Sequence, residues 1–397
     1  MRGRRFYFMI FYVFFHSTGD GCKKSSALRV EFASVWRSLW IDLWCGCLKP
    51  CAMNTSRLPL LLVSVSLSLG LSLQSSRAND AFFSKDGKTV TMGLGGRGGF
   101  GLVQVDIATG KITQAPLPAE LKEESIESVA PGSEGEALFL AKDGVWVWTP
   151  GAATPVKHVC ATKPVVGATD LFVATVPGTP LTDCLFITGN ETADATSMGC
   201  FYGRKPGGKH PFLSIFCRRV NDAMGGIFST DGRLFFVTNG DLWEGGIQVD
   251  EDAGTERFGT LVGARIAPLG VMNTDEANGG SMWVQHAAPA GKWIYAQLRG
   301  HHMASIVRTP MPAKPLYAPG SEETPSTKDQ LTAMSHALSK TEIITEDSEH
   351  VDGFCAIEVG GKPRLFFCGD VEEDKGPALM LWEGAGKPRV IGHLPQD

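Results

Sequence analysis

The chain repeats one short pattern three times: an apolar pair, a polar step, Asp-Gly, and then a run rich in apolar residues. The copies are FFSKDGKTVTM (82–92), FLAKDGVWVW (139–148) and IFSTDGRLFFV (227–237). Asp-Gly between apolar runs is a strong β-hairpin signal, because glycine adopts the positive φ angle that a tight turn requires. The repetition of this signal predicts a fold assembled from similar antiparallel units.

Two further pairs of segments resemble each other. GGKHPFLSIFC (207–217) aligns with GGKPRLFFC (360–368), and VWTPGAATPVKHV (147–159) aligns with LWEGAGKPRVIGHL (381–394). Repeats that each hold several short strands indicate propeller blades, which bury their faces by stacking around an axis. The 47 glycines and 23 prolines agree with many tight turns and few long helices. We therefore predict an all-β fold, a β-propeller of six four-stranded blades, with room for a seventh in the irregular segments.

The blades are expected to follow one another along the chain after residue 78. Their predicted ranges are 79–118, 125–159, 169–217, 222–259, 264–309 and 343–394. We expect the ring to close by the first of these strands joining the last blade.

Residues 314–349 are predicted to be an insertion that carries one short helix. Ser326 followed by Asp329 resembles a helix-capping arrangement. Three apolar residues fall on one face of the expected helix: Leu331, Met334 and Leu338. We expect this helix to cover an edge of the propeller.

The third copy of the pattern continues into a longer motif. IFSTDGRLFFVTNGDLWEGG (227–246) is similar to the blade motif of the TolB-type, WD40-like periplasmic β-propellers, F-S-P-D-G followed by an apolar strand and D-L-W. Thr230 stands where that motif has proline, and Lys85 stands there in the first copy. The resemblance implies a propeller fold and a periplasmic setting. It implies little about function, because the turn and the Trp of the motif are structural.

The first 78 residues do not read as part of the propeller. After Met53, one basic residue precedes the apolar run 58–73, and Ser76-Arg77-Ala78 has the small-x-small form of a signal-peptidase site. We predict a signal peptide over 53–78, cleaved between Ala78 and Asn79, and export to the periplasm or beyond. Residues 1–52 are then an upstream extension, disordered or poorly structured. In the alternative, translation starts at Met1 and the apolar run 6–15 is the signal or an anchor.

Six cysteines follow residue 78, an even number that suggests disulfides in an exported chain. A hairpin turning at Gly361-Lys362 would set Cys355 opposite Cys368. A hairpin centred on Gly208-Lys209 would likewise set Cys200 opposite Cys217. By elimination this leaves one more pair, Cys160 and Cys184. The alternative is that these are free thiols buried in strands.

The sequence offers few candidates for chemistry. His286 and the pair His301-His302 are candidate metal ligands at a propeller mouth, against the alternative of exposed or core histidines. The acidic segments 249–256 and 370–376 lack the order of a calcium loop and are interpreted as solvated. No cofactor is therefore expected, with calcium or another divalent metal as the alternative. A net charge of −5 argues against a nucleic-acid surface, and no G-x-S-x-G elbow occurs.

Two functions fit these features. The first is an exported, monomeric, non-catalytic propeller without a membrane span in its mature form, which binds a protein, a peptide or a glycan through its loops or central channel. The second is a propeller enzyme of the lactonase, lyase or glycosidase type, with a site at the channel mouth. Three or more His, Asp or Glu side chains converging at one mouth would favour the enzyme. A lining of small and apolar groups would favour the binding protein.

Overall fold

The computed structural model divides the chain into two compact units, Met1–Leu73 and Gln74–Asp397. In the first unit it describes one antiparallel hairpin, β1 (Leu28–Ser34) and β2 (Arg37–Leu43). In the second it describes residues 77–394 apart from gaps at 96–100, 123, 127, 143, 191–199, 207–210, 218–223, 239, 250–256, 272–273, 276–279, 282, 301–303, 319–325, 349–350 and 373–374.

The described part of the second unit contains six groups of four antiparallel strands, here called sheets I to VI. Sheet I holds β3 (Arg77–Phe83), β4 (Thr89–Gly95), β5 (Gly101–Asp106) and β6 (Ile112–Gln114). Sheet II holds β7 (Ser128–Pro131), β8 (Ala137–Ala141), β9 (Gly144–Trp148) and β10 (Val156–Ala161). Sheet III holds β11 (Val166–Ala174), β12 (Cys184–Asn190), β13 (Cys200–Arg204) and β14 (Leu213–Cys217).

The other three sheets follow in chain order. Sheet IV holds β15 (Met224–Thr230), β16 (Arg233–Thr238), β17 (Asp241–Val249) and β18 (Arg257–Ala267). Sheet V holds β21 (Trp283–Ala290), β22 (Trp293–Arg299), β23 (Ala304–Pro310) and β24 (Glu342–Ser348). Sheet VI holds β25 (Asp352–Val359), β26 (Lys362–Glu372), β27 (Gly376–Trp382) and β28 (Arg389–His393). A small hairpin, β19 (Thr274–Asp275) with β20 (Gly280–Ser281), precedes sheet V.

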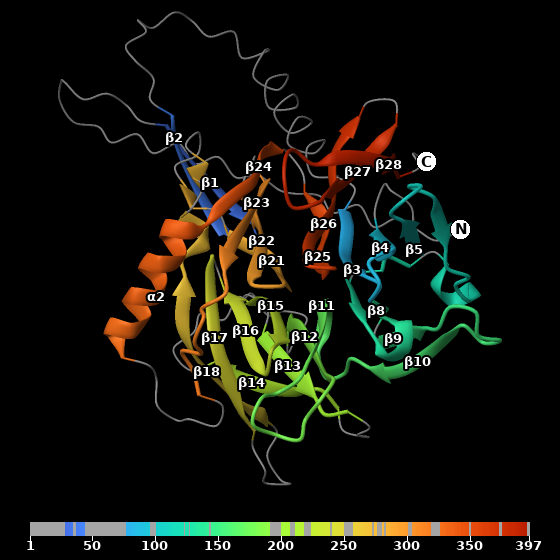
Figure 1. Cartoon of the computed structure of the whole chain (residues 1–397), viewed down its shortest axis with the longest axis horizontal. Helices are drawn as coiled ribbons and strands as arrows, with labels where there is room; N and C mark the ends of the chain where they lie inside the picture. The colour runs from blue at the N-terminus through green and yellow to red at the C-terminus, as the bar shows by residue number, and fades with distance from the viewer. Residues whose placement is uncertain are drawn as a thin grey trace, which may run out of the picture. The chain divides into compact units, whose positions relative to one another are not determined.

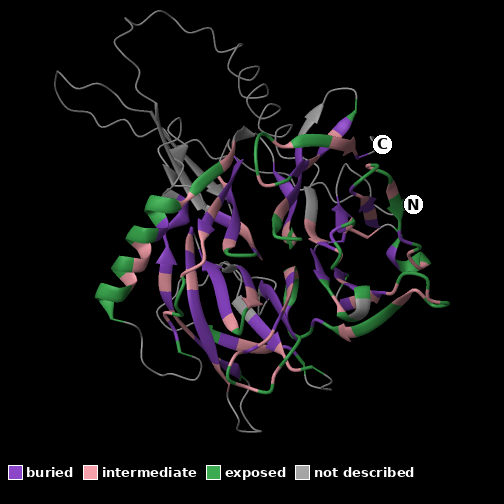
Figure 2. Cartoon of the chain, viewed as in Figure 1, coloured by how far each residue is buried: buried purple, intermediate pink, exposed green. Residues whose placement is uncertain are grey.

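The sheets form a closed ring, which confirms the predicted all-β propeller (Figure 1). The first strands of consecutive sheets, β3, β7, β11, β15, β21 and β25, each contact the next one, and β25 also contacts β3. Six core clusters occupy the six interfaces between neighbouring sheets, and the strands are accordingly buried along much of their length (Figure 2). This stacking is how a twisted four-stranded sheet buries both of its faces.

The ring closes without the predicted exchange of strands. β3 pairs with β4 inside sheet I, and sheet VI is completed by β28 from the C-terminal segment. The expectation that the first strand joins the last blade was therefore wrong. Sheets VI and I instead share the core that holds Phe83 and Phe366.

Two of the three predicted Asp-Gly hairpins turn where the pattern places them. Thr230 pairs with Arg233, so Asp231 and Gly232 form a two-residue turn, with φ angles of 51° and 69°. Gly87, in the first copy, has a φ angle of 67°. The remaining copy differs, because Ala141 pairs with Gly144 and makes that glycine a strand residue. A Cβ at Gly144 would lie 2.8 Å from the His158 ring, so this glycine is needed for packing rather than for the turn.

The outer strands of sheets III and IV join in a way that the sequence did not indicate. β14 pairs in parallel with β18, which links the two groups into one eight-stranded sheet. β18 runs on to Ala267, so the predicted end of the fourth blade at 259 is too early, and the fifth sheet begins at Trp283 rather than at 264.

The insertion contains the predicted helix, α2 (Thr327–Lys340), and Ser326 caps it by accepting a hydrogen bond from the Asp329 amide at 3.2 Å. The apolar face noted in the sequence is not the one that packs most closely on the strands. Leu331 and Leu338 are 58% and 39% exposed, whereas Ala337 is buried against β18 and β23. Small side chains allow the helix backbone to approach the strands closely, so they form the inner face.

The predicted range of the insertion also extends too far. Its last residues form β24, which is the fourth strand of sheet V rather than part of the last blade. Three short 3-10 helices lie in connections: η3 (Ala119–Leu121), η4 (Ser133–Gly135) and η5 (Leu269–Val271). Among the residues described, no helix has both the length and the apolar character needed to cross a membrane.

Candidate functional site

The innermost strands are irregular at corresponding places near their first residues. The register shifts in five of the six: between Ala78 and Ala81, Val166 and Asp170, Met224 and Gly226, Val284 and His286, and Asp352 and Cys355. A β-bulge adds a residue on one strand, bends it and re-aims the neighbouring side chains. The ring therefore carries a belt of irregular backbone around its axis, which frees side chains from the strict in–out alternation of strands.

Three ionisable side chains meet at this belt: Asp80 on β3, Asp170 on β11 and His286 on β21. One potential ligand atom from each lies within 4.8 Å of the other two. The His286 Nε2 atom is 3.0 Å from Asp80 Oδ1, and these side chains are 16% and 11% exposed. The three come from sheets I, III and V, so alternate sheets around the ring each contribute one group. We call them the axial triad.

Hydroxyl groups hold the two carboxylates of the axial triad in place. The buried Ser128, at the start of β7, donates to Asp80 Oδ2 and accepts a hydrogen bond from the Leu171 amide at 3.0 Å. Asp170 Oδ2 accepts from Thr169 at 2.7 Å and from Thr188 on the paired strand β12. These hydrogen bonds involve Oδ2 of each carboxylate, and Oδ1 of Asp80 faces His286.

Burial raises the pKa of Asp80 from 3.8 to about 6. The nearby His286 opposes this rise, the negative charge of Asp170 adds to it, and the Ser128 hydrogen bond opposes it. A carboxylate that is costly to ionise beside a second carboxylate marks a place where positive charge would be stabilised.

The donor set of the axial triad suits a divalent cation. Carboxylate oxygen and imidazole nitrogen are ordinary ligands of Mn²⁺, Zn²⁺ and Fe²⁺. Three protein ligands leave coordination positions for water or a substrate. The Ser–Asp–His order in space is not that of a nucleophilic triad, because Asp80 rather than the imidazole contacts the serine hydroxyl.

Of the metal ligands proposed from sequence, the structure places His286 in the axial triad. His301 and His302 lie outside the described residues, as do residues 250–256 and 373–374 of the two acidic segments. Asp80 and Asp170 were not predicted from the sequence. Neither belongs to a recognisable motif, and the only available signal was a position near the start of each predicted first strand.

A second polar group adjoins the axial triad. Gln285, the extra residue of the β21 bulge, accepts a hydrogen bond from Gln297 Nε2 at 3.1 Å. Arg299 Nη1 lies 3.5 Å from the same Gln285 oxygen and 3.7 Å from Asp352 Oδ1. Gln297 also donates to the Val351 carbonyl, and it is directly paired with His286 across the strands. The arginine is therefore tied to the triad through neighbouring residues of β21 and β22.

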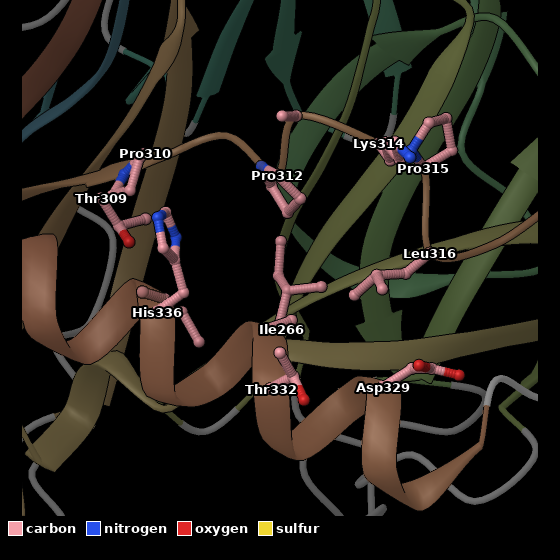
Figure 3. Close-up of a pocket in the computed structure, with 14 residues that line it drawn as sticks. Ile266, Thr309, Pro310, Pro312, Lys314, Pro315, Leu316, Asp329, Thr332 and His336 are labelled. Atoms are coloured by element: carbon pink, nitrogen blue, oxygen red, sulfur yellow. The ribbon is translucent and has the colours of Figure 1, made fainter.

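A separate cavity of about 590 Å³ lies between α2, β18 and the segment that follows β23. Figure 3 shows the imidazole of His336 beside Thr309 and Pro310, with Asp329 at the other end of the helix and Lys314 across the cavity. The walls are otherwise mainly proline, alanine and aliphatic side chains. The cavity gathers no convergent set of ionisable groups, so the axial triad is the stronger candidate site.

The structure revises the predicted geometry of one cysteine pair. The β25–β26 turn falls at Gly360-Gly361, with φ angles of 59° and 76°, and Cys355 pairs with Phe366 rather than with Cys368. Both thiols are free and lie in the core between sheets VI and I. Burial raises the pKa of both thiols, which keeps them protonated at neutral pH.

The described structure does not place the other cysteines in their predicted pairs. Cys160 and Cys184 are also free, and they pack in different cores, between sheets II and III and between sheets III and IV. The side chains of Cys200 and Cys217 lie outside the described residues, and their strands pair with Tyr202 opposite Ser214. The three disulfides stay predictions.

No protein-family model matches the chain, and no curated protein matches it. Similar solved structures include an extracellular domain of BT4673 from B. thetaiotaomicron, described as a hybrid two component system, at 12% identity and a TM-score of 0.40. This match covers 81% of the chain and 34% of BT4673, so the chain spans about a third of that structure.

Two further matches cover most of both partners. YCF48 bound to D1 peptide matches at 10% identity and a TM-score of 0.38, over 80% of this chain and 83% of YCF48. Luciferin-regenerating enzyme matches at 8% identity and a TM-score of 0.47, over 82% of this chain and 96% of the enzyme. At such identities the likenesses concern the fold, and the propeller assignment itself rests on the ring of sheets.

Proposed function

We propose that this chain is an exported propeller enzyme that binds one divalent cation through the axial triad and acts on a small molecule at that cation. The observation that carries the proposal is the convergence of Asp80, Asp170 and His286 from three different sheets. Export with cleavage after Ala78 would keep Asp80 in the mature chain. The sequence alone favoured a non-catalytic binding protein, and this convergence supports the enzyme alternative.

Electrostatics support a cation in preference to a plain hydrogen-bond network. The axial triad brings two partly buried carboxylates together, and their repulsion contributes to the raised pKa of Asp80. A divalent cation bound between them would offset both the repulsion and the burial of charge. Once bound, such an ion polarises a carbonyl group or lowers the pKa of a bound water, which is the chemistry of metal-assisted hydrolysis.

The protein groups would have distinct parts in this chemistry. Ser128, Thr169 and Thr188 hold the carboxylates in place through hydrogen bonds to one oxygen of each. Asp80 contacts both the His286 imidazole and the Ser128 hydroxyl, so it links the proposed cation to the surrounding protein. A lactone or an ester fits this site best among substrate classes. Its hydrolysis requires only a polarised carbonyl and an activated water, and it needs no further catalytic side chain.

The test is cation binding to the purified mature protein after chelation, measured by calorimetry with Mn²⁺, Zn²⁺ and Co²⁺. We expect one site, and Asp80→Asn, Asp170→Asn and His286→Asn should each weaken it by about tenfold or more, because each removes one of three ligands. Asp86→Asn is the matched control, since Asp86 is an exposed turn residue of the same sheet as Asp80. Hydrolysis of a lactone and ester panel should disappear on chelation and return with the cation.

Two results would contradict the proposal. One is the lack of a stoichiometric cation at any of the three metals. The other is binding that Asp80→Asn and Asp170→Asn leave as strong as in the Asp86→Asn control.

A further inference from the structure

Arg299 lies at the end of β22. The described contacts of its guanidinium group are all on one side of that group. The Nη1 atom lies 3.5 Å from Gln285 Oε1 and 3.7 Å from Asp352 Oδ1. The Nε and Nη2 atoms have no hydrogen-bond partner among the residues that the structure describes. These two atoms form the edge of guanidinium that matches the two oxygens of a carboxylate.

The surroundings of Arg299 make this free edge informative. The side chain is 25% exposed, so the guanidinium group is partly covered by protein and partly open to a ligand. Gln285 and Asp352 both lie on the Nη1 side of the guanidinium group, which leaves the opposite edge available to a ligand.

The position of Arg299 relates it to the axial triad. Gln297 pairs directly with His286, and Arg299 lies two residues further along β22, about 7 Å away and on the same face of the strand. Gln285 contacts both Arg299 and Gln297, and it is the chain neighbour of His286. A small molecule bound at the cation can therefore extend toward the free edge of Arg299.

We propose that the site selects a small organic carboxylate: one oxygen-bearing group binds at the axial triad, and the carboxylate binds the Nε–Nη2 edge of Arg299. This inference rests on the cation site proposed above and adds the class of substrate. Asp352 acts as a positioning residue, because it contacts the arginine and not the ligand.

The experiment uses the Co²⁺-loaded mature protein, whose visible absorption reports ligands that reach the metal. It is titrated with glycolate, with the neutral analogue glycolamide, and with inorganic phosphate. We expect glycolate to change the spectrum and to bind about tenfold or more tightly than glycolamide. Arg299→Gln should remove this preference and leave Co²⁺ affinity within about threefold, since the arginine is not a metal ligand.

Two further variants keep the test decisive. Arg299→Lys retains the charge without the paired donors, so it should recover only part of the preference for glycolate. Arg389→Gln is the control for loss of an arginine on the neighbouring sheet VI, where the side chain is 56% exposed, and should behave as the unmodified protein. Thermal unfolding of each variant shows whether the fold is retained.

The outcomes separate the two proposals. Failure of Co²⁺ to bind overturns the proposed function. Co²⁺ binding with equal affinities for glycolate and glycolamide, or with a preference that Arg299→Gln does not reduce, overturns only the carboxylate assignment. Tighter binding of phosphate than of glycolate also overturns it, because the site would then select a different oxyanion.

Discussion

At the scale of single residues, Asp80 couples the proposed function to stability. Its folded-state pKa of about 6 lies above the value of 3.8 expected in the unfolded chain. The folded state therefore binds the proton more tightly, and ionised Asp80 destabilises the cation-free fold above about pH 6. This cost is relieved as the pH falls from 6 toward 4, and it is on the order of 3 kcal/mol at neutral pH.

Asp80→Asn should accordingly stabilise the cation-free protein at pH 7, because the amide carries no charge to bury. The difference in thermal unfolding between the variant and the unmodified protein should shrink as the pH is lowered to 4. Unfolding curves recorded with a chelator at several pH values measure this. A variant less stable than the unmodified protein at pH 7 would show that the carboxylate contributes hydrogen bonding that outweighs its burial.

The residues of the axial triad show what the sequence could and could not reveal. His286 was a candidate from the sequence because it could join the adjacent pair His301-His302 in a metal site at a propeller mouth. Asp80 and Asp170 did not, because aspartate is common and neither lies in a motif. Their meeting depends on register shifts in β3, β11 and β21, and the position of a bulge is decided by packing across the whole ring rather than by local sequence.

At the scale of elements, the sequence predicted which turns and helices are present better than it predicted which of their faces pack on the rest of the protein. The Asp231-Gly232 turn and the capped helix α2 depend on local rules, and both are present. The inner face of α2 depends on what it packs against. The helix face that carries Leu331 and Leu338 is more apolar than the face that carries Ala337. The Ala337 face nevertheless packs on the strands, because a small side chain permits close approach.

A pair of substitutions tests this orientation of α2. Ala337→Leu should destabilise the protein by about 1–3 kcal/mol, because it overfills the contact with β18 and β23. Leu331→Ser, on the exposed face, should change stability by no more than about 0.5 kcal/mol. Urea unfolding of both variants measures these differences, and the reverse order of the two effects would mean that the helix packs through its leucine face.

At the scale of the whole molecule, closure depends on how the first and last sheets meet. The sequence indicated a ring, since repeated units must cover the faces of the first and the last. It did not indicate that sheet VI would take its fourth strand from the C-terminal segment. A strand from the start of the propeller could equally have filled the place that β28 occupies. The observed seam is a side-by-side contact, in which the core of Phe83 and Phe366 is supplemented at the outer edge by Gly110 and β28.

Gly110 gives a direct test of this seam. Its φ angle of 68° matches that of Gly232 at 69°, but the surroundings differ. A Cβ at Gly110 would lie 1.9 Å from the Ile391 carbonyl oxygen of β28, whereas a Cβ at Gly232 would meet no atom within 4 Å. Gly232→Ala should therefore cost about 1 kcal/mol from backbone strain alone. Gly110→Ala should cost about 2–4 kcal/mol, because the same strain is joined by a clash across the seam.

Denaturant unfolding of the two alanine variants measures the difference, and proteolysis near the C-terminal strand reports whether the seam itself has opened. If the ring is closed by this contact, Gly110→Ala should be the less stable variant and should release β28 first, while Gly232→Ala stays protected there. Equal stability losses would show that β28 can move away from the β5–β6 turn at no cost. The seam would then depend on the Phe83–Phe366 core alone, and the outer edges of sheets I and VI would be independent of each other.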